Sequence, residues 1–168
     1  MAGTSIPTSA WVLTEEVAVR ILGVIRKYTT ARIEVERGVD YSVAGEGYEW
    51  VEGVGASIEV EGEAPVEPVR DLLRASGFRQ VDTITNTTEE WNGYKVWEVG
   101  EKWEKLVHAG DGVAIFIQAD LGYVVDSRGV VRLGSVFVYP VMSVWASSPA
   151  VPGPVVCTYD FPQREGLI

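Results

Sequence analysis

The sequence predicts an α+β fold, in which a mainly antiparallel sheet of meanders and hairpins carries two or three helices packed on one face. Apolar residues recur at helical spacing in two segments, and they alternate with polar residues over much of the remainder. Glycine-containing turns between extended runs add the signal for hairpins. The 168 residues predict one domain at 14–146, an N-terminal arm at 1–13 and a Pro-rich extended C-terminal arm at 147–168.

Three helices are expected. The first lies near the N-terminus, the second follows a proline, and the third precedes Gly110. The first runs over 14–28, because Thr14 and two following acids are typical of a capped start. The second is short, starts after Pro68 and ends at Gly77, with the next residue, a phenylalanine, sealing the cap. The third is predicted over 101–109 from apolar residues at helical spacing.

The strands are predicted from alternation and from turn signals. The expected strands are 31–36, 39–43, 48–51, 56–61, 81–88, 94–99, 113–117, 123–126, 130–133 and 136–145. The first four form an antiparallel meander. Asn92-Gly93 and Gly129 favour tight hairpins, and 113–117 has the apolar run of a central strand. Pro140 indicates a bulge or an edge position.

Composition excludes several kinds of site. One Cys excludes a disulfide framework and a Cys-rich zinc site, one His excludes a multi-His metal site, and no cofactor or metal is predicted. The net charge of −10 argues against duplex DNA and an anionic membrane as partners. The N-terminus lacks a signal-peptide pattern, which predicts a cytoplasmic protein. Few Asn, Gln, Cys and Met residues fit a thermophilic source, although a high-GC genome explains them equally well.

Carboxylates are the candidates for catalysis, because glycine-rich phosphate loops and nucleophile motifs are lacking. Asp111, Asp120 and Asp126 lie at predicted strand ends, where a pair of carboxylates binds Mg²⁺ or serves as acid and base. His108 is a candidate base beside Asp111. The competing interpretation is structural: His108 caps a helix and Asp126 forms a turn.

Negative charge is concentrated between residues 31 and 67, which hold ten acids and two arginines. Alternation places these acids on one sheet face, where like charges across strands destabilise the pairing. The strands are therefore not neighbours, or the face is only solvated, or a basic partner or cation covers it. The residues predicted to bind a partner are Glu34, Glu36, Glu59, Glu61 and Glu63.

An uncharged run extends from Leu133 to Tyr159, and its four prolines argue against a membrane helix. We expect a buried strand followed by an extended apolar arm. The arm packs on its own domain or on a neighbouring subunit. The second option predicts a homo-oligomer with Val151, Val155 and Val156 in its interface.

These patterns favour a small acidic protein that binds or assembles through protein contacts without catalysis. It is expected to resemble an inhibitor or immunity protein for a basic enzyme, or an accessory or structural protein of a virus or mobile element. One alternative is a small carboxylate-dependent hydrolase or lyase, with or without a divalent metal. Another is a sugar-binding module that uses the faces of Trp50, Trp91, Trp97 and Trp103.

Overall fold

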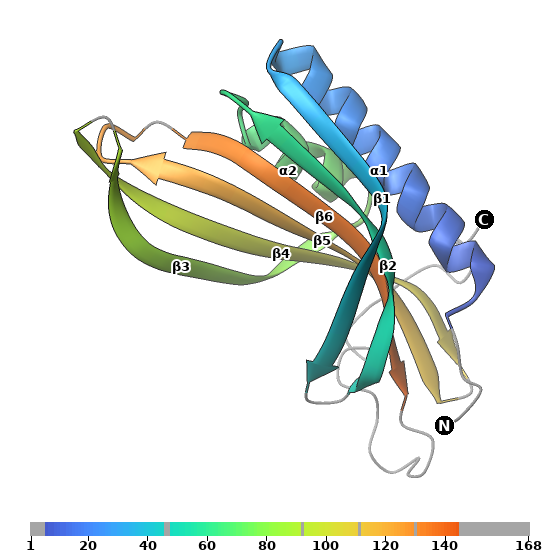
Figure 1. The fold of residues 1–168 in the computed structure, drawn as a ribbon. Coiled ribbons are helices and arrows are strands. Elements are labelled where there is room, and N and C mark those ends of the chain that lie inside the picture. Colours follow the sequence, from blue (N-terminus) through green and yellow to red (C-terminus); the bar gives the residue numbers. More distant parts are fainter. Residues whose placement is uncertain (1–5, 46–47, 92, 111, 130, 145–168) are drawn as a thin grey trace.

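The computed structural model describes residues 6–45, 48–91, 93–110, 112–129 and 131–144. A helix and a β-hairpin are followed by a second helix and a four-stranded meander (Figure 1). In chain order the elements are α1 (Thr8–Tyr28), β1 (Arg32–Gly45), β2 (Tyr48–Glu61), α2 (Glu67–Ala75), β3 (Arg79–Trp91), β4 (Tyr94–Gly110), β5 (Val113–Asp126) and β6 (Val131–Val144). The strands form one antiparallel sheet in the order β1-β2-β6-β5-β4-β3, which confirms the predicted α+β class.

Helix α1 is longer than the sequence predicted, because it begins at Thr8 rather than Thr14. Pro7 precedes it in an extended conformation, and its carbonyl accepts a hydrogen bond from the Ala10 amide at 3.0 Å. Thr14 is not a cap. It is buried inside the helix, and its hydroxyl donates to the Ala10 carbonyl at 2.7 Å. The apolar stripe thus extends toward the N-terminus through Leu13 and Ala10.

Helix α2 ends as predicted. Gly77 has a φ of 89°, a backbone conformation that side chains disfavour, and the Phe78 amide donates to the Leu73 carbonyl at 2.9 Å. The Phe78 ring is 4% exposed and belongs to the core. The predicted cap and its hydrophobic seal are both confirmed.

The helix predicted over 101–109 is wrong, because this segment belongs to strand β4. The spacing of Trp103, Leu106 and Val107 matches a helix only by coincidence. In the strand Glu101 and Trp103 face α2, whereas Glu104 and Leu106 lie on the other side of the sheet. Both glutamates are buried. The buried positions of the strand are therefore not all apolar, and the sequence does not show the alternation of polar and apolar residues that predicts a strand.

The four short strands predicted over 31–61 are two long ones, β1 and β2, joined as a hairpin. Gly38, with a φ of 71°, sits at a register shift rather than at a turn. The two later hairpins lie where the turn signals placed them. Trp91 pairs with Tyr94 around Gly93, and Gly129 has a φ of 86° between β5 and β6. The meander therefore follows from local turn chemistry.

Pro140 occupies an edge-like place within a central strand. The register of β6 with β2 runs from Val138 to Ser135, and Pro140 lies beyond it while still facing Ile117 of β5. On the β2 side the ladder needs no amide donor from this residue. The predicted edge strand or bulge is therefore wrong, because β6 lies between β2 and β5 and Pro140 pairs in register with Ile117.

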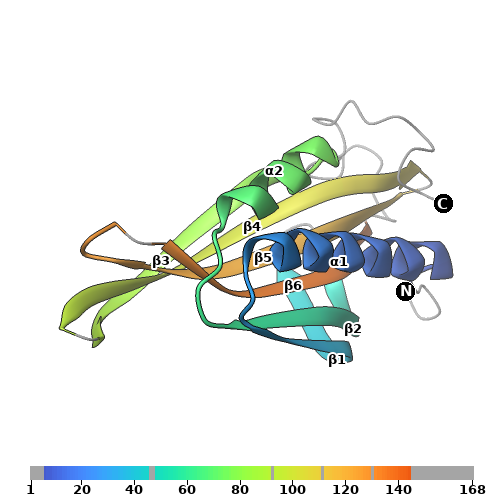
Figure 2. The same cartoon turned by 90° about the horizontal axis from the view of Figure 1, so that it is seen from above.

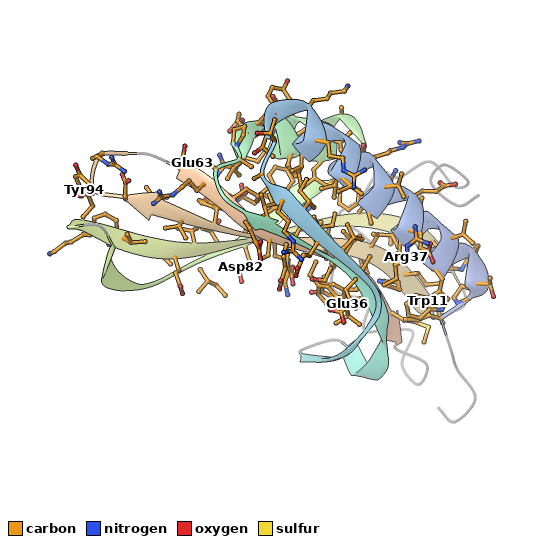
Figure 3. The ribbon with its side chains drawn as sticks, turned by 45° about the horizontal axis from the view of Figure 1, so that its top comes forward. Trp11, Glu36, Arg37, Glu63, Asp82 and Tyr94 are labelled. Carbon is orange, nitrogen blue, oxygen red and sulfur yellow. The ribbon has the colours of Figure 1, made fainter. Side chains whose placement is uncertain are left out.

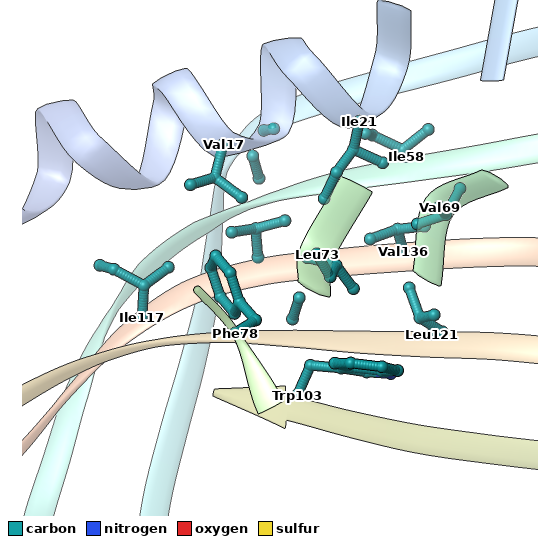
Figure 4. Packing of buried hydrophobic residues seen from close by; sticks show 14 of the residues in the cluster. Val17, Ile21, Ile58, Val69, Leu73, Phe78, Trp103, Ile117, Leu121 and Val136 are labelled. Carbon is teal, nitrogen blue, oxygen red and sulfur yellow. The ribbon is translucent and has the colours of Figure 1, made fainter. Parts of the chain in front are cut away.

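Both helices cover the same face of the sheet (Figure 2). Ile21 of α1 and Leu73 of α2 pack with Ile58, Trp103 and Val136 from three strands (Figure 4). All five are at most 2% exposed. We call this the inner face and its opposite the outer face. The helices thereby leave the outer face to the side chains that the core does not use.

The β1–β2 hairpin and the meander approach each other tightly at Gly55. A Cβ there would meet the Val138 carbonyl oxygen at 2.6 Å and the Phe137 ring at 2.9 Å. We expect Gly55→Ala to lower the free energy of unfolding by about 1–3 kcal/mol, because backbone must shift. Urea unfolding measures the change.

Gly23→Ala is the matched control, since this helical glycine has no atom within 4 Å of its added Cβ. Alanine is the better helix former by roughly 0.5–1 kcal/mol, so the control should be stabilised. Equal unfolding midpoints for wild type and Gly55→Ala would contradict the tight contact.

Candidate functional site

A row of side chains crosses the outer face from β1 to β4. Residues directly opposite each other in an antiparallel pair lie on the same face. The pairings Glu34–Glu59, Glu59–Ser135, Ser135–Gly122 and Gly122–Gly100 therefore place these residues side by side. The row is acidic at its β1 end and consists of small residues toward its β4 end.

The row lies away from both helices. Ile58 and Val136 form the neighbouring pair and belong to the core under α1, so Glu59 and Ser135 face the other way. The same alternation separates Arg37, beside Trp11 of α1, from Glu36, which lies farther from the helix (Figure 3). The described helices thus leave this row uncovered.

Two hollows lie along the row, and the paired residues Glu59 and Ser135 each line one of them. One of about 440 Å³ is lined by Glu34, Val35, Glu36, Ser57 and Glu59. The other of about 340 Å³ is lined by Glu98, Val99, Gly100, Gly122, Tyr123, Val124, Gly134 and Ser135. We define the acidic groove by the residues of this face: Glu34, Glu36, Ser57, Glu59, Glu98, Gly100, Gly122 and Ser135.

Glycine at the floor keeps the groove open. A Cβ on Gly122 would meet the Ser135 hydroxyl at 2.7 Å, whereas one on Gly100 would meet nothing within 4 Å. The space above Gly100 is therefore free for a ligand atom. Glu98 stands at this end of the groove, so carboxylates flank the small residues on both sides.

The electrostatics of the groove are unbalanced. Glu34 faces Glu59 directly, and such a like-charge pair is unfavourable. Arg32 offsets part of this, since its guanidinium lies 2.9 Å from the Glu34 carboxylate and 3.8 Å from that of Glu61. Arg32 is largely exposed, so this compensation is weak. The groove retains a surplus of negative charge.

The structure brings together four of the five glutamates predicted to bind a partner. Glu34, Glu36, Glu59 and Glu61 share the outer face of β1 and β2. Glu63 follows β2, and its carboxylate lies 3.8 Å from Arg132. Because β1 and β2 are neighbours, the idea that distant strands carry these charges is wrong.

The catalytic candidates among the described residues, His108, Asp120 and Asp126, do not converge. Asp111 and the three interface candidates, Val151, Val155 and Val156, lie outside the described residues. His108 faces Ile115, a core residue on the inner side. Asp126 is buried and accepts hydrogen bonds from the Arg128 guanidinium at 2.6 Å and from its amide at 2.9 Å. This is the predicted turn, held by an ion pair.

Asp120 lies within β5, not at a strand end, because β5 continues well past the predicted stop. The Tyr139 hydroxyl donates to its Oδ2 at 2.9 Å, and its Oδ1 is buried without a hydrogen-bond partner. Burial raises the pKa of Asp120, although Lys102 and the Tyr139 hydrogen bond act in the opposite direction. Asp120 lines neither hollow.

A buried network between α2 and the sheet was missed by sequence reasoning. The Glu101 carboxylate accepts hydrogen bonds from the Arg70 Nε at 3.1 Å, the Trp103 indole at 3.0 Å and the Tyr123 hydroxyl. Glu67 extends the network to Arg74. The sequence predicts a helix over 101–109, and nothing in its pattern indicates that Glu101 contacts Arg70. The network fastens α2 to β4 and β5.

Hydrogen bonding controls the charge of Glu101. Burial disfavours the ionised carboxylate, but the hydrogen bonds from Arg70, Tyr123 and Trp103 outweigh it and lower the pKa of Glu101. The hydrogen bond with Glu101 in turn raises the pKa of Arg70. Because Glu101 is 3% exposed, the network is a buried ion pair between α2 and the sheet.

The described residues contain no group of three His, Cys, Asp or Glu side chains arranged to hold a metal ion. Among the described helices, none is both long and apolar enough to cross a membrane. Comparison with known proteins finds no matching family model, curated protein or solved structure. The site must therefore be interpreted from its own geometry, which offers exposed carboxylates around an open floor.

Glu101→Gln tests the network. The variant loses a charge-assisted bond, so we expect it to be less stable at pH 7 by about 1.5–3 kcal/mol. A lowered folded pKa stabilises above the unfolded value, near 4.3, and that stability is lost as the pH falls through the folded pKa. The gap between wild type and variant should therefore shrink below about pH 4.3.

Urea unfolding between pH 7 and pH 3 measures this gap. The exposed neighbour Glu98 supplies the control variant, Glu98→Gln, which should change stability by less than about 0.5 kcal/mol. A gap that stays constant across the pH range would show that the Glu101 charge contributes nothing.

Proposed function

We propose that this protein is a non-enzymatic binding module whose acidic groove holds a basic segment of another protein. The observation that carries the proposal is the Glu34–Glu59 pair, in which two carboxylates face each other across β1 and β2 at the edge of a hollow. A bound Lys or Arg side chain between them converts a repulsion into two attractions.

The floor of the groove supports a polypeptide rather than a single ion. Ser57 and Ser135 present hydroxyl groups on this face, and Gly100 leaves space above the sheet. Carboxylates stand at both ends, so cations spaced along one extended segment have partners at each end. Such binding is fast and weakens as salt is added.

An inhibitor or immunity protein for a basic enzyme is the form of this function that the groove supports best. The predicted homo-oligomer and cytoplasmic location are compatible with it and stay predictions. The broader expectation of an accessory or structural protein of a virus or mobile element also stays a prediction.

Acid–base catalysis has one observation in its favour, the raised pKa of Asp120. Against it, the unpaired Oδ1 is buried and Asp120 lines neither hollow. Sugar binding receives less support. Trp103 is 2% exposed in the core and cannot offer a stacking face. We therefore do not propose either activity.

Removing one carboxylate should stabilise the free protein. Glu59→Gln abolishes the repulsion with Glu34 and leaves the Arg32–Glu34 ion pair intact. We expect the free energy of unfolding to rise by about 0.2–1 kcal/mol at low salt, and the gain to disappear in concentrated salt. Urea unfolding at two salt concentrations measures it.

Glu61→Gln is the matched control on the same strand and face. Glu61 pairs with Arg32, so its neutralisation removes an attraction and should not stabilise. If both variants shift the unfolding midpoint equally, the effect is one of net charge, and the Glu34–Glu59 repulsion is irrelevant.

Binding is tested with a decalysine peptide as the probe, using calorimetry at two salt concentrations. The triple variant Glu34→Gln, Glu36→Gln, Glu59→Gln should weaken binding roughly threefold to a hundredfold, as expected for the loss of three exposed ion pairs. The dissociation constant of the wild type should also rise with salt.

The control triple carries the same charge change on the helices, away from the groove: Glu15→Gln, Glu16→Gln, Asp71→Asn. It should retain nearly all of the wild-type affinity. Equal weakening by the two triples, or no binding of decalysine by the wild type, would falsify the proposed function.

A further inference from the structure

Two strands, β1 and β3, lie at the edges of the sheet. Figure 2 shows β1 along the border of the sheet. On its outward side an edge strand has backbone N–H and C=O groups that no neighbouring strand uses. Among the described residues, β2 is the only strand that pairs with β1. Strand β1 therefore offers a row of backbone donors and acceptors to a further strand.

The regular part of this edge runs from Arg32 to Arg37. The register of β1 with β2 is unbroken from Arg32–Glu61 to Arg37–Ala56 and shifts at Gly38, whose φ is 71°. Such an irregularity bends a strand and interrupts its ladder. An added strand therefore pairs with the stretch before Gly38.

The side chains of this stretch alternate between two kinds of chemistry. Glu34 and Glu36 point to the outer face, where they line the same hollow as Glu59. Val35 lies between them on the inner face, opposite the core residue Ile58, and is 42% exposed. Helix α1 thus leaves this apolar side chain partly uncovered. The edge presents an acidic, an apolar and an acidic side chain in turn.

We propose that the basic segment of the partner binds as an added strand along the free edge of β1. This inference rests on the proposed function and specifies how the basic segment is held. Its sequence then alternates, with a Lys or Arg opposite Glu34, an apolar residue opposite Val35 and a second Lys or Arg opposite Glu36. The alternation is the same whichever way the added strand runs, because successive side chains of any strand point to opposite faces.

The added strand also explains how a cation reaches the Glu34–Glu59 pair. Neighbouring strands lie about 4.8 Å apart, so a lysine opposite Glu34 starts one strand away from it and two strands away from Glu59. The flexible four-carbon stem of lysine then lets its ammonium lie over β1, between the two carboxylates. The edge anchors the backbone of the segment, and the acidic groove binds its charges.

Charge favours a basic strand over a second copy of this chain. Over this stretch the outer face of the β1–β2 hairpin carries four carboxylates and one guanidinium, that of Arg32. The other arginine, Arg37, is on the inner face, and its guanidinium lies 3.7 Å from the Glu15 carboxylate of α1. A second copy would bring the same negative surplus to the edge, whereas a basic strand neutralises it.

The opposite edge of the sheet suits this partner less well. Residues 79–85 of β3 contain a single acid, Asp82, so no pair of carboxylates alternates there. The register of β3 with β4 also shifts between Gln80 and Asp82, close to the start of the strand. Strand β3 therefore serves as the internal control for the test of β1.

Three capped peptides test the inference by calorimetry with the full-length chain. The first is a heptapeptide in which lysines alternate with valines. The second has the same residues in two blocks, and the third is the alternating peptide with every backbone amide methylated. The first should bind roughly tenfold more tightly than either of the others, because only it combines alternating cations with free amide donors.

Hydrogen exchange locates the bound peptide. In complex with the alternating peptide, the amide of every second residue between Arg32 and Arg37 should exchange at least roughly tenfold more slowly, because alternate amides of an edge strand point outward. The amides of β3 should keep their exchange rates.

Tighter binding of the alternating peptide together with slower exchange in β1 supports the inference. If decalysine binds but the three peptides bind equally, or if exchange slows in β3 or in neither edge strand, the edge inference is overturned and the proposed function stands. A failure of decalysine itself to bind overturns the proposed function and this inference with it.

Discussion

The fold depends on a short stretch of pairing between two parts of the chain that are far apart in sequence. Among the described residues, strand β2 pairs with β6 over a short register that runs from Ala56–Val138 to Glu59–Ser135. Every other neighbouring pair in the sheet is a hairpin between consecutive strands. This one seam joins the β1–β2 hairpin to the meander, brings Ile58 against Val136 in the core and places Glu59 beside Ser135 in the acidic groove. Core and candidate site therefore have the same origin.

Local chemistry explains what could be predicted from the sequence. The end of α2 at Gly77 and the hairpins at Gly93 and Gly129 follow from conformations that a few residues decide among themselves. The acidic alternation of β1 was visible for the same reason. These features require no knowledge of what lies across the sheet.

The remainder depends on contacts between distant residues. The segment around Glu101 has a helical pattern, and it becomes a strand because Arg70, Trp103 and Tyr123 satisfy a buried carboxylate there. The acidic groove could not be predicted from the sequence either, because it depends on the strand registers that align Glu34, Glu59, Ser135 and the two glycines. A sequence gives the residue types, but it does not show which residues are aligned across neighbouring strands.

The seam also has a consequence for how the chain reaches this structure. Contacts between residues so far apart close slowly, and until they form, the edges of β2 and β6 are available to other chains. The carboxylates of β1 and β2 repel a second hairpin during that interval, as charged residues beside apolar strands do in other sheets. Their mutual repulsion is thus a safeguard against aggregation while the protein assembles, whatever occupies the groove afterwards.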